Sequence, residues 1–130
     1  MVLRVLIVDD NAHFLEAARE LLEREGLDVV GVAGTAGEAL ERVRELQPEV
    51  TLVDIELGGE SGFDLAGRLS DGPDDAPRVI LISTYTEQDF RDLIDASPVI
   101  GFVSKSDLSA QAILAILAHP GGEGDGEGRR

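Results

Sequence analysis

Five short, largely β-branched apolar runs alternate along the chain with stretches whose apolar residues recur at a helical spacing. The runs cover residues 3–8, 28–33, 50–53, 79–82 and 99–104. Nearly continuous hydrophobicity over so few residues is typical of strands that are covered on both faces. Strands that alternate with helices form right-handed βαβ units and a parallel sheet. The pattern therefore predicts an α/β fold.

The stretches between the runs carry helix signals. Thr35 and Glu38, for example, have the spacing of a capping box. Five strands and five helices in about 118 residues match the flavodoxin-like doubly wound fold, a single domain with strand order 2-1-3-4-5. The expected helices are one that follows a cap at Asn11, one that begins at Thr35 and stops before Pro48, one over residues 63–70, one capped by Thr86 and one over residues 109–118.

The last twelve residues differ from the rest in composition. Residues 119–130 are rich in glycine and charged side chains and contain almost nothing to bury. Such a segment does not gain enough apolar burial to offset the entropy of ordering. We expect a domain over residues 1–118 and a disordered tail over residues 119–130.

Four of the five apolar runs stop on residues that can do chemistry. The first ends at Asp9 and Asp10, the third at Asp54, the fourth at Ser83 and the fifth at Lys105. Parallel strands share one edge at their C-terminal ends, and open α/β sheets bind ligands there. In the expected strand order the first and third strands are neighbours. The three aspartates are therefore expected to meet, with the hydroxyl and the ammonium beside them.

The chemistry of this group suits a phosphoryl acceptor. Three close carboxylates repel each other unless a cation is present, and Mg²⁺ prefers carboxylate, water and phosphate oxygens. A phosphoryl group on Asp54 would offer one oxygen to Lys105, one to the Ser83 hydroxyl and one to Mg²⁺. Taken alone, most of these residues have a plainer explanation. Asp9 and Asp10 would be a solvated strand end with a capping role for the next helix. Ser83 would be one of many strand-end serines, and Lys105 a snorkelling residue at the sheet edge. The plain explanation is weaker for Asp54, because this acid interrupts a hydrophobic run.

Composition excludes several classes of function. The formal net charge of −15 disfavours direct nucleic-acid binding and binding to anionic membranes, because both require a positive field. The absence of cysteine excludes disulfides and agrees with a cytoplasmic protein. No apolar run approaches the roughly 20 residues of a membrane span. Lys105 is the one lysine beside ten arginines, which gives this compact ammonium added interest.

Four motifs together resemble the receiver domain of bacterial two-component response regulators, which has a chemotaxis-regulator-like fold. They are Val-Leu-Ile-Val-Asp-Asp-Asn at 5–11, Asp-Ile-Glu-Leu-Gly-Gly-Glu-Ser-Gly at 54–62, Leu-Ile-Ser-Thr at 81–84 and Gly-Phe-Val-Ser-Lys at 101–105. The resemblance covers residues 1 to about 118. It implies that Asp54 accepts a phosphoryl group from a histidine kinase or phosphotransfer protein in a phosphorelay.

The resemblance also implies the remaining roles at the site. Asp10 would coordinate Mg²⁺ directly, Asp9 largely through water, and Glu56 through its backbone carbonyl, while Lys105 would pair with a phosphoryl oxygen. Ser83 and Phe102 match the switch hydroxyl and the switch aromatic. Their movement would change the surface of the fourth helix, fifth strand and fifth helix, where a downstream effector or a second copy of the chain would bind. The uncharged fifth helix, residues 109–118, agrees with an interface there, and alanine-rich packing is the alternative.

The chain departs from the usual receiver pattern at two places. Gly58, followed by Gly59, stands where the family usually has proline, so we expect a more mobile loop beside the site. Ser106 stands where proline commonly follows the lysine. A cis bond before a non-proline residue costs about 2.5–4 kcal/mol, so we expect a trans bond after Lys105.

Three functions remain open on the residues alone. The first, which we favour, is a phosphorylation-dependent switch that is no enzyme beyond its own phosphorylation and dephosphorylation. The second is a receiver-fold interaction module that does not use the site, or the receiver part of a truncated helix-turn-helix transcription regulator. The third is a Mg²⁺-dependent phosphohydrolase with Asp54 as nucleophile, which Glu56 disfavours because such enzymes typically have a second aspartate at that position.

Overall fold

The computed structural model describes residues 2–71, 77–85 and 87–118. Two neighbouring strands of a single central sheet end at the aspartates, and two others end at the serine and the lysine. The strands of this sheet are β1 (Arg4–Val8), β2 (Asp28–Ala33), β3 (Val50–Asp54), β6 (Arg78–Ser83) and β7 (Gly101–Ser104). The helices are α1 (Ala12–Arg24), α2 (Ala36–Leu46), α3 (Gly62–Ser70), α4 (Arg91–Asp95) and α5 (Ala110–Ala118).

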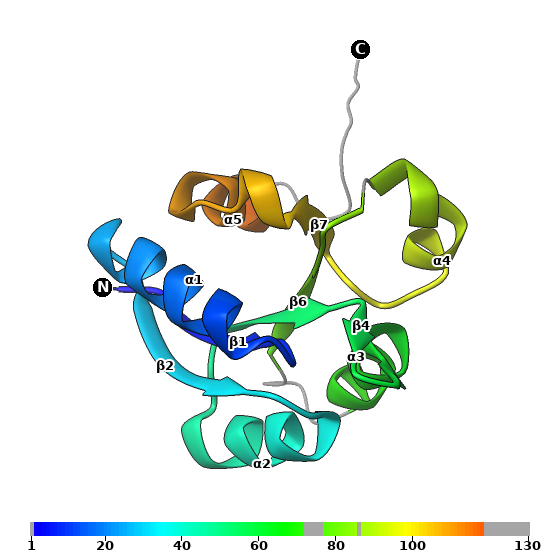
Figure 1. Cartoon of the computed structure of the whole chain (residues 1–130), viewed down its shortest axis with the longest axis horizontal. Helices are drawn as coiled ribbons and strands as arrows, with labels where there is room; N and C mark the ends of the chain where they lie inside the picture. Colours follow the sequence, from blue (N-terminus) through cyan, green and yellow to red (C-terminus); the bar gives the residue numbers. More distant parts are fainter. Residues whose placement is uncertain (1, 72–76, 86, 119–130) are drawn as a thin grey trace.

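The sheet is parallel throughout, in the order β2-β1-β3-β6-β7. Figure 1 shows the sheet surrounded by the helices. In the numbering of the five sheet strands alone the order is 2-1-3-4-5, so the predicted doubly wound topology is confirmed. The register places Val8 opposite Val53 and Ser83 opposite Ser104. The residues that follow or end these strands consequently meet at one edge.

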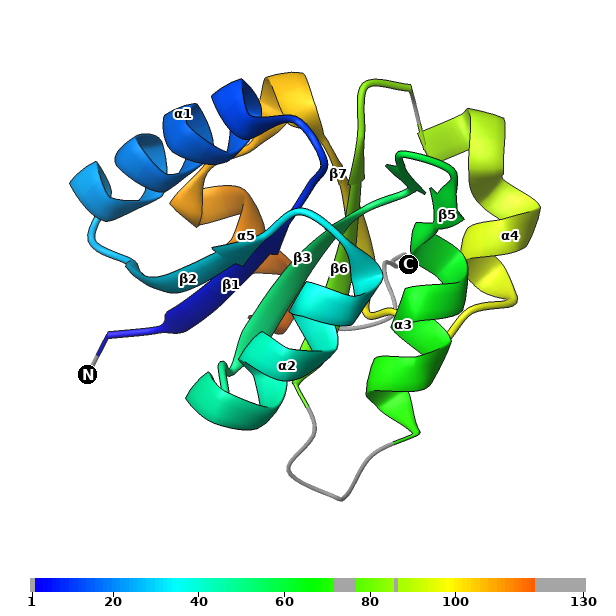
Figure 2. The same ribbon diagram turned by 60° about the horizontal axis from the view of Figure 1, so that its bottom comes forward.

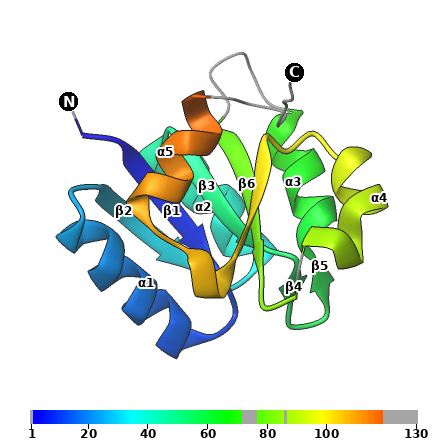
Figure 3. The same cartoon turned by 90° about the horizontal axis from the view of Figure 1, so that it is seen from above.

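Two helical layers cover the sheet (Figure 2). Helices α1 and α5 pack on one face through a cluster that includes Leu22 and Ile113, both fully buried. Helices α2 and α3 cover the opposite face. Helix α4 packs beside them through Ile94, and Phe90, which caps it, packs there as well. Figure 3 shows the sheet between these layers. Burial on both faces explains why the strands are apolar at nearly every position.

The helix caps largely follow the sequence signals. Oδ1 of Asn11 accepts hydrogen bonds from the backbone nitrogens of His13 and Phe14, as expected of an N-cap. Oγ1 of Thr35 likewise accepts from the nitrogen of Glu38. In a capping box the Glu38 carboxylate would accept from the backbone nitrogen of Thr35. Here it accepts from that of Gly34, one residue earlier than predicted.

The fourth helix is shorter than the sequence suggested. A 3-10 turn over Glu87–Phe90 precedes α4, whose five residues begin at Arg91. Phe90 is the N-cap and its side chain makes no capping hydrogen bond. The predicted cap, Thr86, lies outside the described residues. No side-chain acceptor holds the start of α4, and its tighter first turn begins before the α-helical part.

A small antiparallel hairpin, β4 (Glu56–Leu57) with β5 (Glu60–Ser61), was not predicted. It lies directly after β3, with Gly58 and Gly59 at its turn. The last strand was predicted to begin at Val99, whereas β7 begins at Gly101. The predicted tail, residues 119–130, lies outside the described residues. Among the described helices none is long and apolar enough to span a membrane.

Candidate functional site

Three carboxylates converge at the C-terminal edge of β1 and β3. Asp9 is fully buried, Asp54 is 7% exposed and Asp10 is exposed. One oxygen from each residue lies within 4.8 Å of the others, and this is a cluster of metal-binding geometry among the described residues. The neighbouring positions of β1 and β3 therefore bring together the aspartates that sequence reasoning placed together.

Backbone hydrogen bonds fix two of these carboxylates. The backbone nitrogen of Asn11 donates to Oδ1 of Asp9 at 2.8 Å, and that of Glu56 donates to Oδ1 of Asp54 at 3.3 Å. Both donors lie two residues after the carboxylate, where the chain turns away from the strand. In each residue Oδ2 is left facing the middle of the cluster, where Lys105 reaches it.

The Lys105 ammonium lies between the two buried acids. Its Nζ is 2.6 Å from Oδ2 of Asp9 and 3.3 Å from Oδ2 of Asp54, and only 15% of the side chain is exposed. The side chain comes from the 3-10 turn that follows β7. The peptide bond after Lys105 is trans, as predicted from Ser106.

Burial and neighbouring charges shift the pKa values of two groups at the site, Asp54 and Lys105. Burial, reinforced by the negative charge of Asp9, raises the pKa of Asp54 from 3.8 to about 6, although Lys105 and the Glu56 amide oppose the rise. Burial alone lowers the pKa of Lys105. The close approach of Asp9 and the charge of Asp54 outweigh it, so the pKa is raised above 10.5. One ammonium thus leaves the acidic cluster short of positive charge.

The donor set fits a small, hard divalent cation. Oδ2 of Asp9 is buried and accepts no hydrogen bond of good geometry from the described residues, so its partner is the ammonium alone. Every ligand atom the cluster offers is a carboxylate oxygen, the type that Mg²⁺ prefers. Glu56 is exposed and contributes its side chain to none of these contacts.

The β4–β5 hairpin borders the cluster. Gly58 and Gly59 have φ values of +56° and +99°, which suit glycine at a tight hairpin turn. A Cβ at residue 58 would lie 3.0 Å from Oδ2 of Asp10. Oε1 of Glu60 accepts from the backbone nitrogen of Ala36, which ties the hairpin to the start of α2. The predicted mobility of this loop stays a prediction.

The two predicted switch residues lie on neighbouring strands. Ser83 is 3% exposed, and its Oγ accepts a hydrogen bond of 3.0 Å from the backbone nitrogen of Tyr85. Phe102 on β7 is half-buried and packs against the cluster under α2, α3 and α4. The Tyr85 ring is half-exposed and meets Phe90 edge-on at 5.7 Å between centroids.

Sequence reasoning missed one residue that contacts the site and one that ties the neighbouring hairpin to α2. The Phe14 ring lies under the ammonium of Lys105, with 4.4 Å between Nζ and the ring centroid. Phe14 was interpreted only as part of the apolar stripe of the first helix, and nothing in that pattern separates it from its neighbours. Glu60 was passed over because an acidic residue in a loop carries no signal of a distant backbone partner.

Comparison with known proteins agrees with this geometry. The sequence profile of the response regulator receiver domain matches residues 5–117. A protein-glutamate methylesterase/protein-glutamine glutaminase of Myxococcus xanthus is 40% identical over 87 residues, covering 66% of this chain and 25% of that protein. Response regulator GacA of Pseudomonas viridiflava is 30% identical over 116 residues, covering 88% of this chain and 54% of that protein.

Solved structures agree as well. A LuxR-family two-component response regulator from Aurantimonas sp. SI85-9A1 superposes with a TM-score of 0.81 at 30% identity, covering 92% of this chain and 88% of that one. The chain spans about a quarter to a little over half the length of the curated relatives named above. The profile match covers most of the chain, and the chain belongs to the response regulator receiver domain family.

Proposed function

We propose that this chain is the phosphoryl acceptor of a two-component phosphorelay and that Asp54 takes the group from a histidine kinase or phosphotransfer protein. The observation that carries the proposal is the shared position of Lys105 between Asp9 and Asp54, inside a cluster of three carboxylates. An acceptor carboxylate must be held beside positive charge that can meet the incoming phosphoryl oxygens. This edge of the sheet supplies that arrangement.

The transfer forms one bond and breaks one. A carboxylate oxygen of Asp54 attacks phosphorus, and an O–P bond forms as the P–N bond of the donor's phosphohistidine breaks. The electron pair of that bond goes to the leaving imidazole nitrogen, which then takes a proton. The product is an acyl phosphate on Asp54. At neutral pH most of Asp54 is ionised even with a pKa of about 6, so the nucleophile is available.

The chain's own residues hold the product. Lys105 is already 3.3 Å from Oδ2 of Asp54 and needs only a small displacement to pair with a phosphoryl oxygen. The Ser83 hydroxyl, which accepts from Tyr85, can donate its own proton to a second oxygen. Asp9, Asp10, Asp54 and the carbonyl of Glu56 would hold Mg²⁺, which supplies charge neutralisation for the phosphoryl oxygens.

The signal would leave through Ser83 and Phe102. When the Ser83 hydroxyl turns toward the phosphoryl group, the half-buried Phe102 ring is free to rotate inward, and the surface of α4, β7 and α5 changes. The two helices that flank this surface carry exposed apolar side chains: Leu93 on α4 is 54% exposed and Leu114 on α5 is 48% exposed. A downstream effector or a second copy of the chain would bind there. No direct contact with nucleic acid or membrane is proposed.

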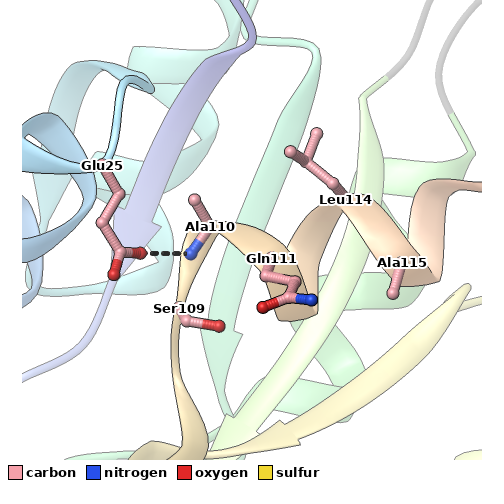
Figure 4. A pocket seen from close by; sticks show the side chains of 6 residues that line it. All are labelled: Glu25, Ser109, Ala110, Gln111, Leu114 and Ala115. Carbon is pink, nitrogen blue, oxygen red and sulfur yellow. Dashed lines mark hydrogen bonds between the residues drawn. The ribbon is translucent and has the colours of Figure 1, made fainter.

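Leu114 also borders a shallow pocket between α5 and the end of α1 (Figure 4). Glu25 lines this pocket and accepts a hydrogen bond of 2.6 Å from the backbone nitrogen of Ala110, the first residue of α5. Leu114→Asp should abolish self-association or effector binding without loss of stability, because Leu114 lies outside the core. Sedimentation velocity with and without phosphorylation measures this, and unchanged association would contradict the proposed surface.

Intact mass spectrometry after incubation with acetyl phosphate and Mg²⁺ tests the acceptor role. The expected result is the gain of one phosphoryl group, lost in Asp54→Asn and on removal of Mg²⁺ with a chelator. No gain in the wild-type chain would instead favour an interaction module that does not use the site. Sustained turnover of a generic phosphate ester, lost in Asp54→Asn, would favour a phosphohydrolase.

A further inference from the structure

The ring of Phe14 completes a closed path of contacts around the lysine. Oδ1 of Asp9 accepts from the nitrogen of Asn11, and Oδ1 of Asn11 accepts from the nitrogen of Phe14 at 3.2 Å. The Phe14 ring faces Nζ of Lys105 at 4.4 Å, and Nζ returns to Oδ2 of Asp9 at 2.6 Å. The same short segment therefore positions a buried carboxylate and the ring against which its counter-ion rests.

We propose that Phe14 is a positioning residue that holds the Lys105 ammonium over its ring face, beside the acceptor Asp54. The inference rests on the proposed function, because it gives Phe14 a part in phosphoryl transfer. A lysine side chain carries a compact, strongly hydrated charge on a flexible four-carbon stem. Contacts with neighbouring groups must therefore restrict where the ammonium lies. An aromatic face attracts an ammonium through the ring quadrupole, and more strongly where water is excluded.

The ring has an advantage over a further carboxylate at this place. A divalent cation and the ammonium would compete for the oxygens of Asp9 and Asp54 and would repel each other. The face of Phe14 attracts the ammonium without using a carboxylate oxygen. The ammonium can then stay at the edge of the site when its carboxylate partners are shared.

Phe14 is held firmly enough for this purpose. It lies in the first turn of α1, three residues after the cap at Asn11. Its ring is half-buried and packs against the cluster between α1, α5 and the sheet. Its neighbour Leu15 is also half-buried and packs on that cluster, but its aliphatic side chain has no ring face to offer the lysine. Leu15 therefore offers a matched control for a general loss of packing.

The single lysine makes the contact directly observable. Lysine labelled with ¹³C at Cε gives one side-chain signal in the full-length chain, and a ring below the ammonium shifts the attached protons upfield. We expect this shift in the wild type and in Phe14→Tyr, and its loss in Phe14→Leu and Phe14→Met. Leu15→Ala should keep it. An unchanged Lys105 signal in both ring-free variants would overturn the inference.

The rate of phosphorylation tests the functional part. With acetyl phosphate and Mg²⁺ held constant, Phe14→Leu should slow phosphorylation about threefold to tenfold, the effect of losing one cation–π contact. Phe14→Tyr should restore a rate within about twofold of the wild type, since its ring face is retained. Leu15→Ala should also be phosphorylated at a rate within about twofold of the wild type. Its thermal unfolding measures how much stability the lost packing costs.

The two arms separate the inference from the proposed function. If the wild-type chain gains no phosphoryl group, the proposed function fails, whereas the lysine signal still decides whether Phe14 holds the ammonium. If the wild type is phosphorylated and Phe14→Leu reacts as fast, the role in transfer is wrong even where the ring shift is lost. Slowing in Leu15→Ala equal to that in Phe14→Leu would assign the effect to packing and also overturn the role.

Discussion

Gly62 lies so close to Asp54 that a Cβ at residue 62 would come within 2.9 Å of the Asp54 carbonyl carbon, and within 2.8 Å of Cα of Ile55. The backbone nitrogen of Gly62 also donates to the carbonyl oxygen of Ile55 at 2.7 Å. The start of α3 is therefore pressed directly against the end of β3. Only glycine fits, because the neighbouring atoms are backbone and cannot turn aside.

Gly62→Ala should destabilise the protein by at least about 2–3 kcal/mol, because a forced backbone shift is an overpacking defect. The matched control is Gly67→Ala in the same helix, where a Cβ meets nothing within 4 Å. That variant should gain roughly 0.5–1 kcal/mol from the better helix propensity of alanine. Urea unfolding of both variants checks this, and equal stabilities would contradict the close approach at Gly62.

The raised pKa of Asp54 predicts a pH-dependent stability. The folded state holds a proton up to about pH 6, whereas the unfolded chain releases it near 3.8. Between these values the folded state binds more protons, so this group's contribution to stability falls as the pH rises. Relative to Asp54→Asn, the wild type should lose on the order of 1 kcal/mol between about pH 5 and pH 7.5.

Urea unfolding of the wild type and Asp54→Asn at the two pH values, without divalent cations, measures this difference. Asp28→Asn is a suitable control, since Asp28 is exposed at the start of β2, at the other end of the sheet from the site. The same measurements on Asp28→Asn show how much of the change comes from removing a carboxylate away from the site. A wild type that gains stability relative to Asp54→Asn as the pH rises would contradict the raised pKa.

Mg²⁺ binding should offset the repulsion between the clustered carboxylates and so raise the free energy of unfolding. A cation that binds only the folded state stabilises it by about 2.7 kcal/mol at a concentration of 100 times Kd. The gain should be smaller near pH 5, where Asp54 is largely protonated and offers a weaker ligand. Asp10→Asn should lose most of the gain, because one of three clustered ligands becomes neutral. Thermal unfolding with and without Mg²⁺ measures it, and Asp28→Asn should respond as the wild type does.

The sheet and the meeting of the three aspartates with the lysine were predictable because they follow from topology. Once the strands at residues 4–8 and 50–54 are neighbours, the backbone alone places Asp9 beside Asp54 at the same edge of the sheet. The caps at Asn11 and Thr35 were predictable for a similar reason: they depend on bonds within three residues.

Contacts that depend on packing between distant segments were not predictable. Glu60 reaches Ala36 across 24 residues, and Phe14 meets Lys105 across the gap between the first helix and the last strand. The position at which α4 begins, after a 3-10 turn, was not predicted either. A threonine before an apolar stripe indicated a cap, whereas the structure begins the α-helix at Arg91 with no side-chain cap. Local propensity gives way to tertiary packing in such short helices.

The glycine pair beside the site gives a prediction that separates backbone strain from contact with the acids. Gly58 and Gly59 both have positive φ, so alanine at either position should cost about 1–2 kcal/mol of stability. They differ in their surroundings. A Cβ at Gly58 would lie 3.0 Å from Oδ2 of Asp10, whereas at Gly59 it would meet nothing within 4 Å.

Gly58→Ala should therefore weaken Mg²⁺ binding, because the Asp10 carboxylate must move away from the added methyl group. Gly59→Ala should bind Mg²⁺ like the wild type while losing similar or greater stability. Calorimetric titration with Mg²⁺ measures the affinities, and urea unfolding measures the two stabilities. Equal Mg²⁺ affinity in both variants would show that Asp10 has room to shift without leaving the cluster, and that the hairpin contributes to the site only through its fold.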